Sequence, residues 1–269
     1  FHSACVRILR RDIDRLGFAS SFTIYDTDDS LRVIKDCMKD LNLDDKQFQP
    51  RSILGYISRA KDAMKLADEY LAECEKSGDY RLIKIAKVYS EYQRRLWEAN
   101  ALDFDDIILH TVRLLQQFEE VRGYYQRKFR YVLIDEYQDT NNLQYLLASA
   151  LAGGYENFCV VGDDDQSIYR FRGATIENIL SFEKQYPACR TIRLEENYRS
   201  TKHILEAANA VIRNNQGRKG KELWTRAGEG EKLHLYTAMN ESDEAQYVAA
   251  RVLEDYGQGL RWKDHAVLY

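Results

Sequence analysis

The chain has 269 residues, 39 of them Lys or Arg and 43 Asp or Glu, with a formal net charge of -4 and 45% hydrophobic residues. This composition excludes an intrinsically disordered chain and predicts two ordinary domains or one large one. No apolar run approaches the roughly 20 residues that a membrane-spanning helix requires, and the net charge alone does not indicate a nucleic-acid-binding protein.

The first residue is Phe1 rather than Met, and no signal peptide follows it. We therefore expect the chain to be a piece of a longer protein. The five cysteines include no CxxC pair, and the five histidines are scattered. This spacing supports neither a zinc site nor a disulfide framework, and reduced cysteines in the cytoplasm fit it best.

The first part of the chain is predicted to be almost entirely helical. Apolar residues recur every three or four positions over 3–16, which is typical of an amphipathic helix. After a loop over 17–29, Ser30 is predicted to start a second helix. Similar patterns predict a helix over 58–76 and another from about 82 to 96. Residues 17 to about 97 are therefore predicted to form a helical region.

After one more helix, "FDDIILHTVRLLQQF", the pattern changes to short apolar runs rich in β-branched residues. Runs of this kind alternating with helices predict a parallel sheet covered by helices. The predicted strands are 131–134, 158–161, 191–194, 233–237 and 265–269, and the predicted helices between them are 141–152, 175–185 and 241–256.

Two of these strands end in acidic residues. Asp135 and Glu136 follow the run in "YVLIDEYQDTNN", and Gly162 followed by three aspartates ends the next strand. Ligands of parallel α/β sheets bind at the carboxyl ends of the strands. There, an aspartate suits hydrated Mg²⁺ and a glutamate can activate water, as hydrolysis of a nucleoside triphosphate requires. Acids in this place also suit the start of the following helix, so this stretch alone leaves both interpretations open.

Two further stretches bear on whether the chain is a nucleoside triphosphatase that acts on nucleic acid. In "VVGDDDQSIYRFRGA" the acids are followed by aromatic rings interleaved with arginines, a composition that can stack bases and contact phosphates. In "LEENYRST" an arginine follows a predicted strand and could reach a γ-phosphate, although a surface ion pair is the simpler interpretation. The region from Tyr186 to Arg226 has nine Lys or Arg and four Asp or Glu. It could contact phosphates or be an ordinary solvated surface.

In this order and spacing, the three stretches resemble motifs II, III and IV of superfamily 1 DNA helicases of the UvrD/Rep/PcrA type. "FHSACVRILR" resembles their motif Ib, "ALDFDDII" the stretch before motif II, and "RKGKELWT" a segment beyond motif IV. The resemblance is weak over 17–97, where the family has its helical 1B insertion. Tyr137 stands where Phe is usual, and Phe171 where Trp is common.

The resemblance implies an ATP-dependent helicase that moves 3′ to 5′ on single-stranded DNA and unwinds duplex DNA, with ATP and Mg²⁺ as cofactors. It implies that Asp135 holds Mg²⁺, Glu136 activates water and Gln166 senses the γ-phosphate. It further implies that Tyr198 stacks on adenine, that Arg199 contacts the γ-phosphate, and that DNA is contacted by His2, Tyr169, Phe171 and Arg172.

The implied fold is a RecA-like α/β parallel sheet of the P-loop NTPase type with an all-helical insertion, truncated at both ends. Domain 1A would comprise 1–16 and 98–190, domain 1B 17–97, and the start of domain 2A 191–269. The sequence contains no P-loop, GxxxxGK(S/T). Its one similar dipeptide, Gly220-Lys221, is followed by Glu222 and follows no predicted strand. We therefore expect this chain alone to be inactive.

Two alternatives remain open from the sequence. A subunit of a helicase–nuclease of the RecB or AddA kind shares motifs II to IV. A non-catalytic nucleic-acid-binding module would apply if the natural chain began at Phe1. A P-loop shortly upstream would establish an ATPase, and a nuclease domain further along would indicate the helicase–nuclease.

Overall fold

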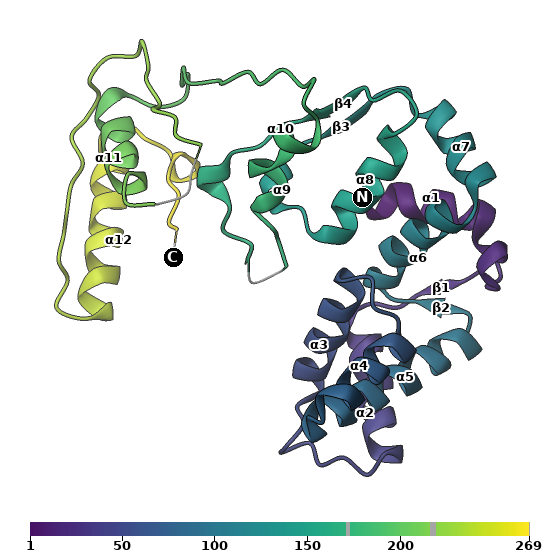
Figure 1. The fold of residues 1–269 in the computed structure, drawn as a ribbon. Helices are drawn as coiled ribbons and strands as arrows, with labels where there is room; N and C mark the ends of the chain where they lie inside the picture. The colour runs from purple at the N-terminus through teal and green to yellow at the C-terminus, as the bar shows by residue number, and fades with distance from the viewer. Residues whose placement is uncertain (171–172, 216–218, 269) are drawn as a thin grey trace. The chain divides into compact units, whose positions relative to one another are not determined.

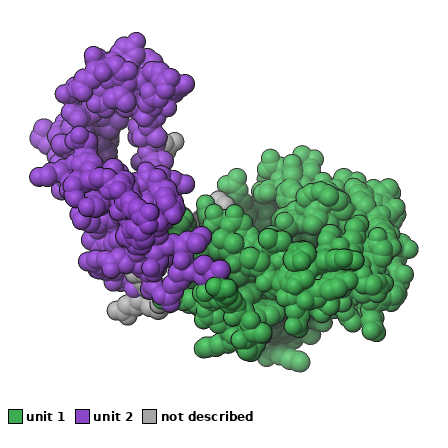
Figure 2. Space-filling model, turned by 90° about the horizontal axis from the view of Figure 1, so that it is seen from above, with its two compact units in different colours: residues 1–191, 217–219 green, residues 192–216, 220–269 purple. Residues whose placement is uncertain are grey.

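The computed structural model describes residues 1–170, 173–215 and 219–268. It divides into two compact units (Figure 2). The first comprises residues 1–191 and 217–219, and the second comprises residues 192–216 and 220–269. No helix in the described ranges combines the length and the apolar character needed to cross a bilayer.

The first unit contains a bundle of four helices with a hydrophobic core of its own (Figure 1). Buried residues between Ile34 and Ala101 form this core, among them the fully buried rings of Tyr89 and Tyr92. The long apolar face of the last helix supplies both tyrosines. The four helices are α2 (Thr27–Asp40), α3 (Pro50–Asp62), α4 (Ala67–Ser77) and α5 (Tyr80–Glu98).

A second core in the same unit joins the beginning of the chain to the segment that follows the bundle. Its buried residues lie between Cys5 and Phe22 and between Leu102 and Leu147. The two cores thus draw on different parts of the sequence. The elements around this second core are α1 (His2–Asp12), η1 (Ile13–Leu16), α6 (Phe104–Gln117), α7 (Glu119–Lys128) and α8 (Asn142–Ala152).

Two helix predictions in the helical bundle need correction. The second helix begins at Thr27 rather than Ser30, because Asp26 caps it. The Asp26 side chain accepts from the Asp29 N–H, and the Asp29 side chain accepts from the Asp26 N–H, so the two residues form a capping box. The helix predicted over 58–76 is two helices, α3 and α4. The break falls at Met64, whose φ of 60° is left-handed and cannot continue a right-handed helix.

The described residues form two sheets, each of two parallel strands. β1 (Thr23–Ile24) pairs with β2 (Ala101–Leu102) at the entry and exit of the helical bundle. β3 (Val132–Ile134) pairs with β4 (Phe158–Val160), in the register Val132 to Phe158 and Ile134 to Val160. The parallel pairing confirms the sheet type that the sequence predicted. The helix predicted over 175–185 is divided into α9 (Glu177–Leu180) and α10 (Phe182–Gln185).

The second unit has fewer regular elements than predicted. Its helices are α11 (Lys202–Ile212), α12 (Glu241–Gly257) and the short η5 (Trp262–Asp264). α12 confirms the helix predicted over 241–256. The predicted strands 191–194 and 233–237 are wrong, and 265–268 is not a strand either. An apolar run becomes a strand only when a neighbour supplies the ladder hydrogen bonds, and no described segment pairs with these three.

Candidate nucleotide-binding site

The loops that follow β3 and β4 begin at the same edge of the sheet. The Val161 N–H donates to the Ile134 carbonyl oxygen at 2.8 Å, and the Tyr137 N–H donates to the Val161 carbonyl oxygen at 2.9 Å. The pairing therefore continues past both strands. The two acidic stretches start side by side, as the carboxyl ends of parallel strands should.

The acid pair after β3 has an unusual backbone. Glu136 has φ 51° and ψ 43°, in the left-handed region that non-glycine residues rarely adopt. Such residues cluster at functional sites, where the surrounding structure maintains them. The Glu136 N–H donates to Asp135 Oδ1 at 2.9 Å. Asp135 is exposed, and its other oxygen receives no hydrogen bond from the described residues. A carboxylate of this kind suits a hydrated Mg²⁺, which needs only one or two protein ligands.

The buried amide of Gln138 joins the two loops, a role that sequence reasoning missed. Its Nε2 donates to Glu136 Oε2 at 2.8 Å, and its Oε1 accepts from the Asp163 N–H at 2.9 Å. A Cβ on Gly162 would lie 2.6 Å from that Oε1, so glycine is needed there for the close approach. An amide two residues after the acid pair and a glycine before the second acid run were the signals available in the sequence.

The loop after β4 gathers three carboxylates. Oxygens of Asp163, Asp164 and Asp165 lie within 4.8 Å of one another, and all three residues are half-buried. Gln166 ends the short helix η3 (Asp164–Gln166), and its Nε2 donates to Asp163 Oδ2 at 2.7 Å. The amide that the resemblance assigns to γ-phosphate sensing is therefore tied to the second acid loop.

The predicted DNA-contacting residues are only partly described. Tyr169 is half-buried, and its carbonyl oxygen accepts from the Ala174 N–H at 3.3 Å. Phe171 and Arg172 lie outside the described residues. His2 is exposed at the start of α1, and its ring lies edge-on to Phe104 with the centroids 5.8 Å apart. His2 Nε2 and the Phe104 carbonyl oxygen are 3.1 Å apart. The predicted motif Ib thus meets the "ALDFDDII" stretch at the start of α6.

In the second unit, Asn197 shapes the turn that carries Tyr198 and Arg199. Its Oδ1 accepts from the N–H groups of Arg199 at 3.0 Å and Ser200 at 2.8 Å. The Tyr198 ring is 85% exposed, and its hydroxyl donates to Glu196 at 3.0 Å. That hydrogen bond raises the pKa of Tyr198. The guanidinium of Arg199 is exposed and pairs with no described residue, and the Tyr198 side chain is exposed as well, so both can contact a ligand.

Comparisons with known proteins match both parts of the chain to helicase domains. Residues 1–187 match the UvrD/REP helicase N-terminal domain, and residues 192–269 match the UvrD-like helicase C-terminal domain. The chain belongs to the UvrD/REP helicase family. It is 53% identical over 269 residues to a Staphylococcus aureus protein named ATP-dependent DNA helicase PcrA. It is also 52% identical to the protein of that name from Bacillus subtilis. All of this chain is covered in both comparisons, but it spans only 36% of the length of either relative.

This UvrD/REP helicase chain also has a buried ion cluster that sequence reasoning missed. Lys61 of α3 is fully buried, with Nζ 2.7 Å from Asp103 and 2.8 Å from Asp106. Tyr92 adds a hydrogen bond to Asp103 at 2.8 Å. Burial alone would lower the pKa of Lys61, but the two carboxylates raise it well above its usual value. Burial likewise lowers the pKa of His110, to about 3, so this imidazole is neutral.

The pKa values of Asp103 and Asp106 are shifted in opposite directions from their usual value. Burial and the neighbouring Asp103 raise the pKa of Asp106 to about 7. Burial also opposes ionisation of Asp103, but Lys61 and the hydrogen bonds lower its pKa below the usual value. Both acids form the capping box of α6 in the "ALDFDDII" stretch. The spacing of a capping box was visible in the sequence, but its cationic partner was not.

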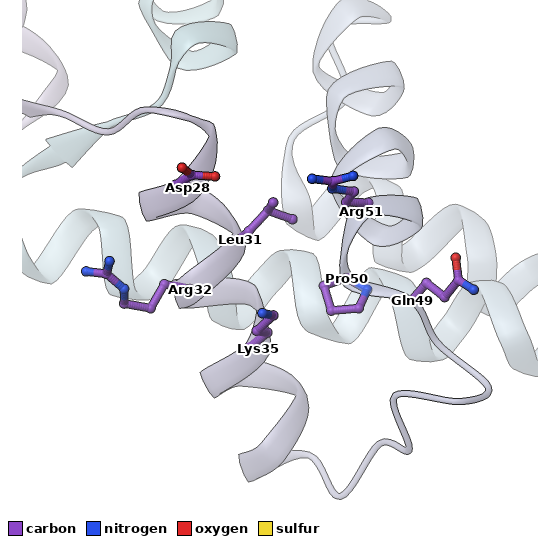
Figure 3. A pocket seen from close by; sticks show the side chains of 7 residues that line it. All are labelled: Asp28, Leu31, Arg32, Lys35, Gln49, Pro50 and Arg51. Atoms are coloured by element: carbon purple, nitrogen blue, oxygen red, sulfur yellow. The ribbon is translucent and has the colours of Figure 1, made fainter.

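A separate hollow of about 620 Å³ lies on the helical bundle of the UvrD/REP chain (Figure 3). Its lining comes from one side of α2 and from the start of α3. None of the site residues predicted from the sequence lines it. The residues around it are Asp28, Leu31, Arg32, Lys35, Gln49, Pro50 and Arg51.

Proposed function

We propose that this chain is part of an ATP-dependent DNA helicase that couples ATP hydrolysis to 3′-to-5′ movement on single-stranded DNA and to duplex unwinding in the cytoplasm. The observation that carries the proposal is the edge of the β3–β4 sheet. Two acid loops begin there side by side, joined by the buried amide of Gln138. The matches to both UvrD helicase domains and the name of the relatives support the same activity.

Asp135 and Glu136 take different roles in this proposal. Asp135 holds Mg²⁺, which when bound neutralises charge on the phosphates of ATP. Glu136 accepts a proton from the attacking water. The Gln138 amide holds the Glu136 carboxylate through Oε2 and leaves the other oxygen for water. Gln166 senses the γ-phosphate and transmits its presence to the loop that contacts DNA.

The second unit supplies groups for the other parts of the nucleotide. Tyr198 stacks on the adenine, and Arg199 stabilises charge that develops on the γ-phosphate during transfer. The exposure of both side chains on a turn held by Asn197 supports these roles. For DNA, Tyr169 and Phe171 stack on bases, Arg172 links the DNA and ATP sites, and His2 lies in the DNA groove.

We propose the domain organisation 1–16 with 98–190 as domain 1A, 17–97 as the inserted helical domain 1B, and 191–269 as part of domain 2A. The two separate cores of the first unit support an insertion, because the core between Ile34 and Ala101 belongs to the bundle of α2 to α5. The pairing of β1 with β2 closes the bundle where the chain enters and leaves it.

The test is Glu136→Gln in the full-length protein that contains this chain. Glutamine keeps the shape and still accepts from Gln138, but it cannot act as the base. We expect the kcat for ATP hydrolysis to fall by about 10²–10⁴-fold, with nucleotide affinity changed only a few-fold. Asp135→Asn should instead weaken Mg²⁺-dependent nucleotide binding. Near-normal turnover by Glu136→Gln would show that this residue is only an acid at the start of the next segment.

A further inference from the structure

The last turn of α3 is anchored on the start of α6. Lys61 lies there with no exposed surface, in contact with the two acids that cap α6. A lysine in such a place cannot swing away without leaving its charge and two carboxylates unpaired, a large cost in a buried site. The end of α3 is therefore a rigid support.

Asp62, the residue after Lys61, reaches the segment that follows the candidate catalytic acids. Its Oδ1 accepts from Asn141 Nδ2 at 2.8 Å, and its carbonyl oxygen accepts from Asn142 Nδ2 at 3.2 Å. Asn141 is the N-cap of α8, with its own Oδ1 accepting from the Gln144 N–H at 2.9 Å. The asparagine that starts α8 is thus held by the helical bundle through its free amide group.

The stretch that resembles motif III, residues 160–174, also approaches Asp62. A Cβ on Gly173 would lie 2.9 Å from Asp62 Oδ2, and Gly173 itself has a φ of 87°, which favours glycine. Burial and the nearby Asp105 raise the pKa of Asp62 to about 7, which reflects how closely the carboxylate is enclosed. One side chain of the bundle therefore lies against the loops that follow both β3 and β4.

The loop from Glu136 to Asn141 is held at both ends. At the first end, Gln138 binds Glu136 and the Asp163 backbone. At the second end, Asn178 of α9 donates to the Thr140 carbonyl oxygen at 3.1 Å, and Asp62 accepts from Asn141. The left-handed backbone of Glu136 persists only while its surroundings maintain it. Loosening the second end would let this strained segment relax.

We propose that Asp62 is a positioning residue for ATP hydrolysis, which ties the loop of Glu136 to the rigid end of α3 through Asn141. The proposal rests on the proposed function, because it assigns Glu136 to the attacking water. It also makes the helical bundle part of the support of the nucleotide site. A catalytic group displaced by about 1 Å can cost on the order of 10²-fold in rate, so a tether of this kind acts on kcat.

The test compares three single variants and one double variant in the full-length protein. Asp62→Ala removes the acceptor, whereas Asp62→Asn keeps an oxygen for Asn141 Nδ2. Asn141→Ser removes the donor but preserves a good N-cap for α8. We expect Asp62→Ala and Asn141→Ser each to lower kcat about 10-fold with the KM for ATP within about twofold, and Asp62→Asn to retain most of the activity. The double variant Asp62→Ala with Asn141→Ser should lose no more than either alone, since both remove one contact.

Hydrogen–deuterium exchange of the peptide over 136–147 gives a readout that does not depend on activity. Its amides should exchange faster in Asp62→Ala and Asn141→Ser, but not in Asp62→Asn. Asp36→Ala is the control, because Asp36 is exposed on α2 and makes no hydrogen bond or ion pair with the described residues.

Normal kcat and unchanged exchange in both Asp62→Ala and Asn141→Ser would overturn the positioning role. Additive losses in the double variant would also overturn it. A failure of the proposed function looks different: Glu136→Gln would then turn over ATP normally, while the exchange difference at 136–147 persisted.

Discussion

At the scale of single residues, Tyr137 shows that a buried position can carry a polar atom without a partner. Its side chain has no exposed surface and packs edge-on against Phe158 and Phe182. No described residue forms a hydrogen bond with its hydroxyl. Burial raises the pKa of Tyr137 as well, so the group is a neutral phenol. The hydroxyl therefore costs desolvation without recovering a hydrogen bond.

Tyr137→Phe should stabilise the first unit. Removing an unsatisfied buried hydroxyl is expected to gain about 1 kcal/mol in the free energy of unfolding, equivalent to roughly 2–4 °C in Tm. Tyr186→Phe is the matched control in the same aromatic cluster, because the Tyr186 hydroxyl donates to Ser149 Oγ at 3.2 Å. That change should be destabilising by about 0.5–1.5 kcal/mol. Thermal and urea unfolding of both variants measure the difference, and a destabilised Tyr137→Phe would imply a hydrogen-bond partner for the hydroxyl.

At the scale of elements, one buried lysine connects α3, α5 and α6. Lys61 comes from α3, its two carboxylates cap α6, and Tyr92 of α5 donates to one of them. Apolar packing supplies most of the stabilisation of the bundle, but it does not fix how one helix is placed against the next. The charges require one arrangement, because any other leaves them buried and unpaired.

Lys61→Met should be strongly destabilising although methionine is similar in size and more apolar. It leaves Asp103 and Asp106 side by side without a cation, and removing one partner of a buried pair typically costs about 3–5 kcal/mol. Lys65→Met is the control, since Lys65 pairs with Glu73 at 39% side-chain exposure. An exposed pair of this kind is worth about 0–1 kcal/mol. Denaturant unfolding should separate the two variants clearly, and equal stabilities would mean that the buried charges are not essential to the bundle.

At the scale of the whole molecule, the groups proposed to bind ATP are divided between two units. The carboxylates and Gln166 belong to the first, and Tyr198 and Arg199 belong to the second. Neither unit contains a P-loop sequence, whose backbone amides and lysine bind the β- and γ-phosphates in P-loop NTPases. The chain therefore carries residues proposed for the ATP site in both units but not the groups that a P-loop supplies.

We predict that the purified chain of residues 1–269 does not hydrolyse ATP, with or without single-stranded DNA. The physical reason is the missing P-loop rather than misfolding, so circular dichroism should show a folded, mainly helical protein. Phosphate release measured beside the full-length protein under the same conditions tests this. DNA-stimulated ATP hydrolysis by the chain alone would contradict the prediction, because it would require other groups in the chain to bind the phosphates.

The sequence by itself determined the features that depend on neighbours along the chain. Periodic apolar residues predicted α5, α6 and α12, and acids placed after two apolar runs predicted the edge of the β3–β4 sheet. These signals are local, because a helix satisfies its backbone within a few residues and a strand end is marked by the residue that follows it. The family motifs are local in the same sense.

Only the tertiary structure decided which distant groups meet. The strands predicted at 191–194 and 233–237 did not form, because a strand depends on a partner that its own residues cannot specify. In the sequence, Gln138 and Asp62 resemble ordinary polar residues. In the fold, Gln138 contacts Asp163, and Asp62 contacts Asn141, which is 79 positions away in the sequence. Lys61 likewise pairs with Asp103 and Asp106, which are separated from it in the sequence by α4 and α5. Such contacts follow from burial, which brings charges and amides together wherever leaving them unpaired would cost more than ordering them.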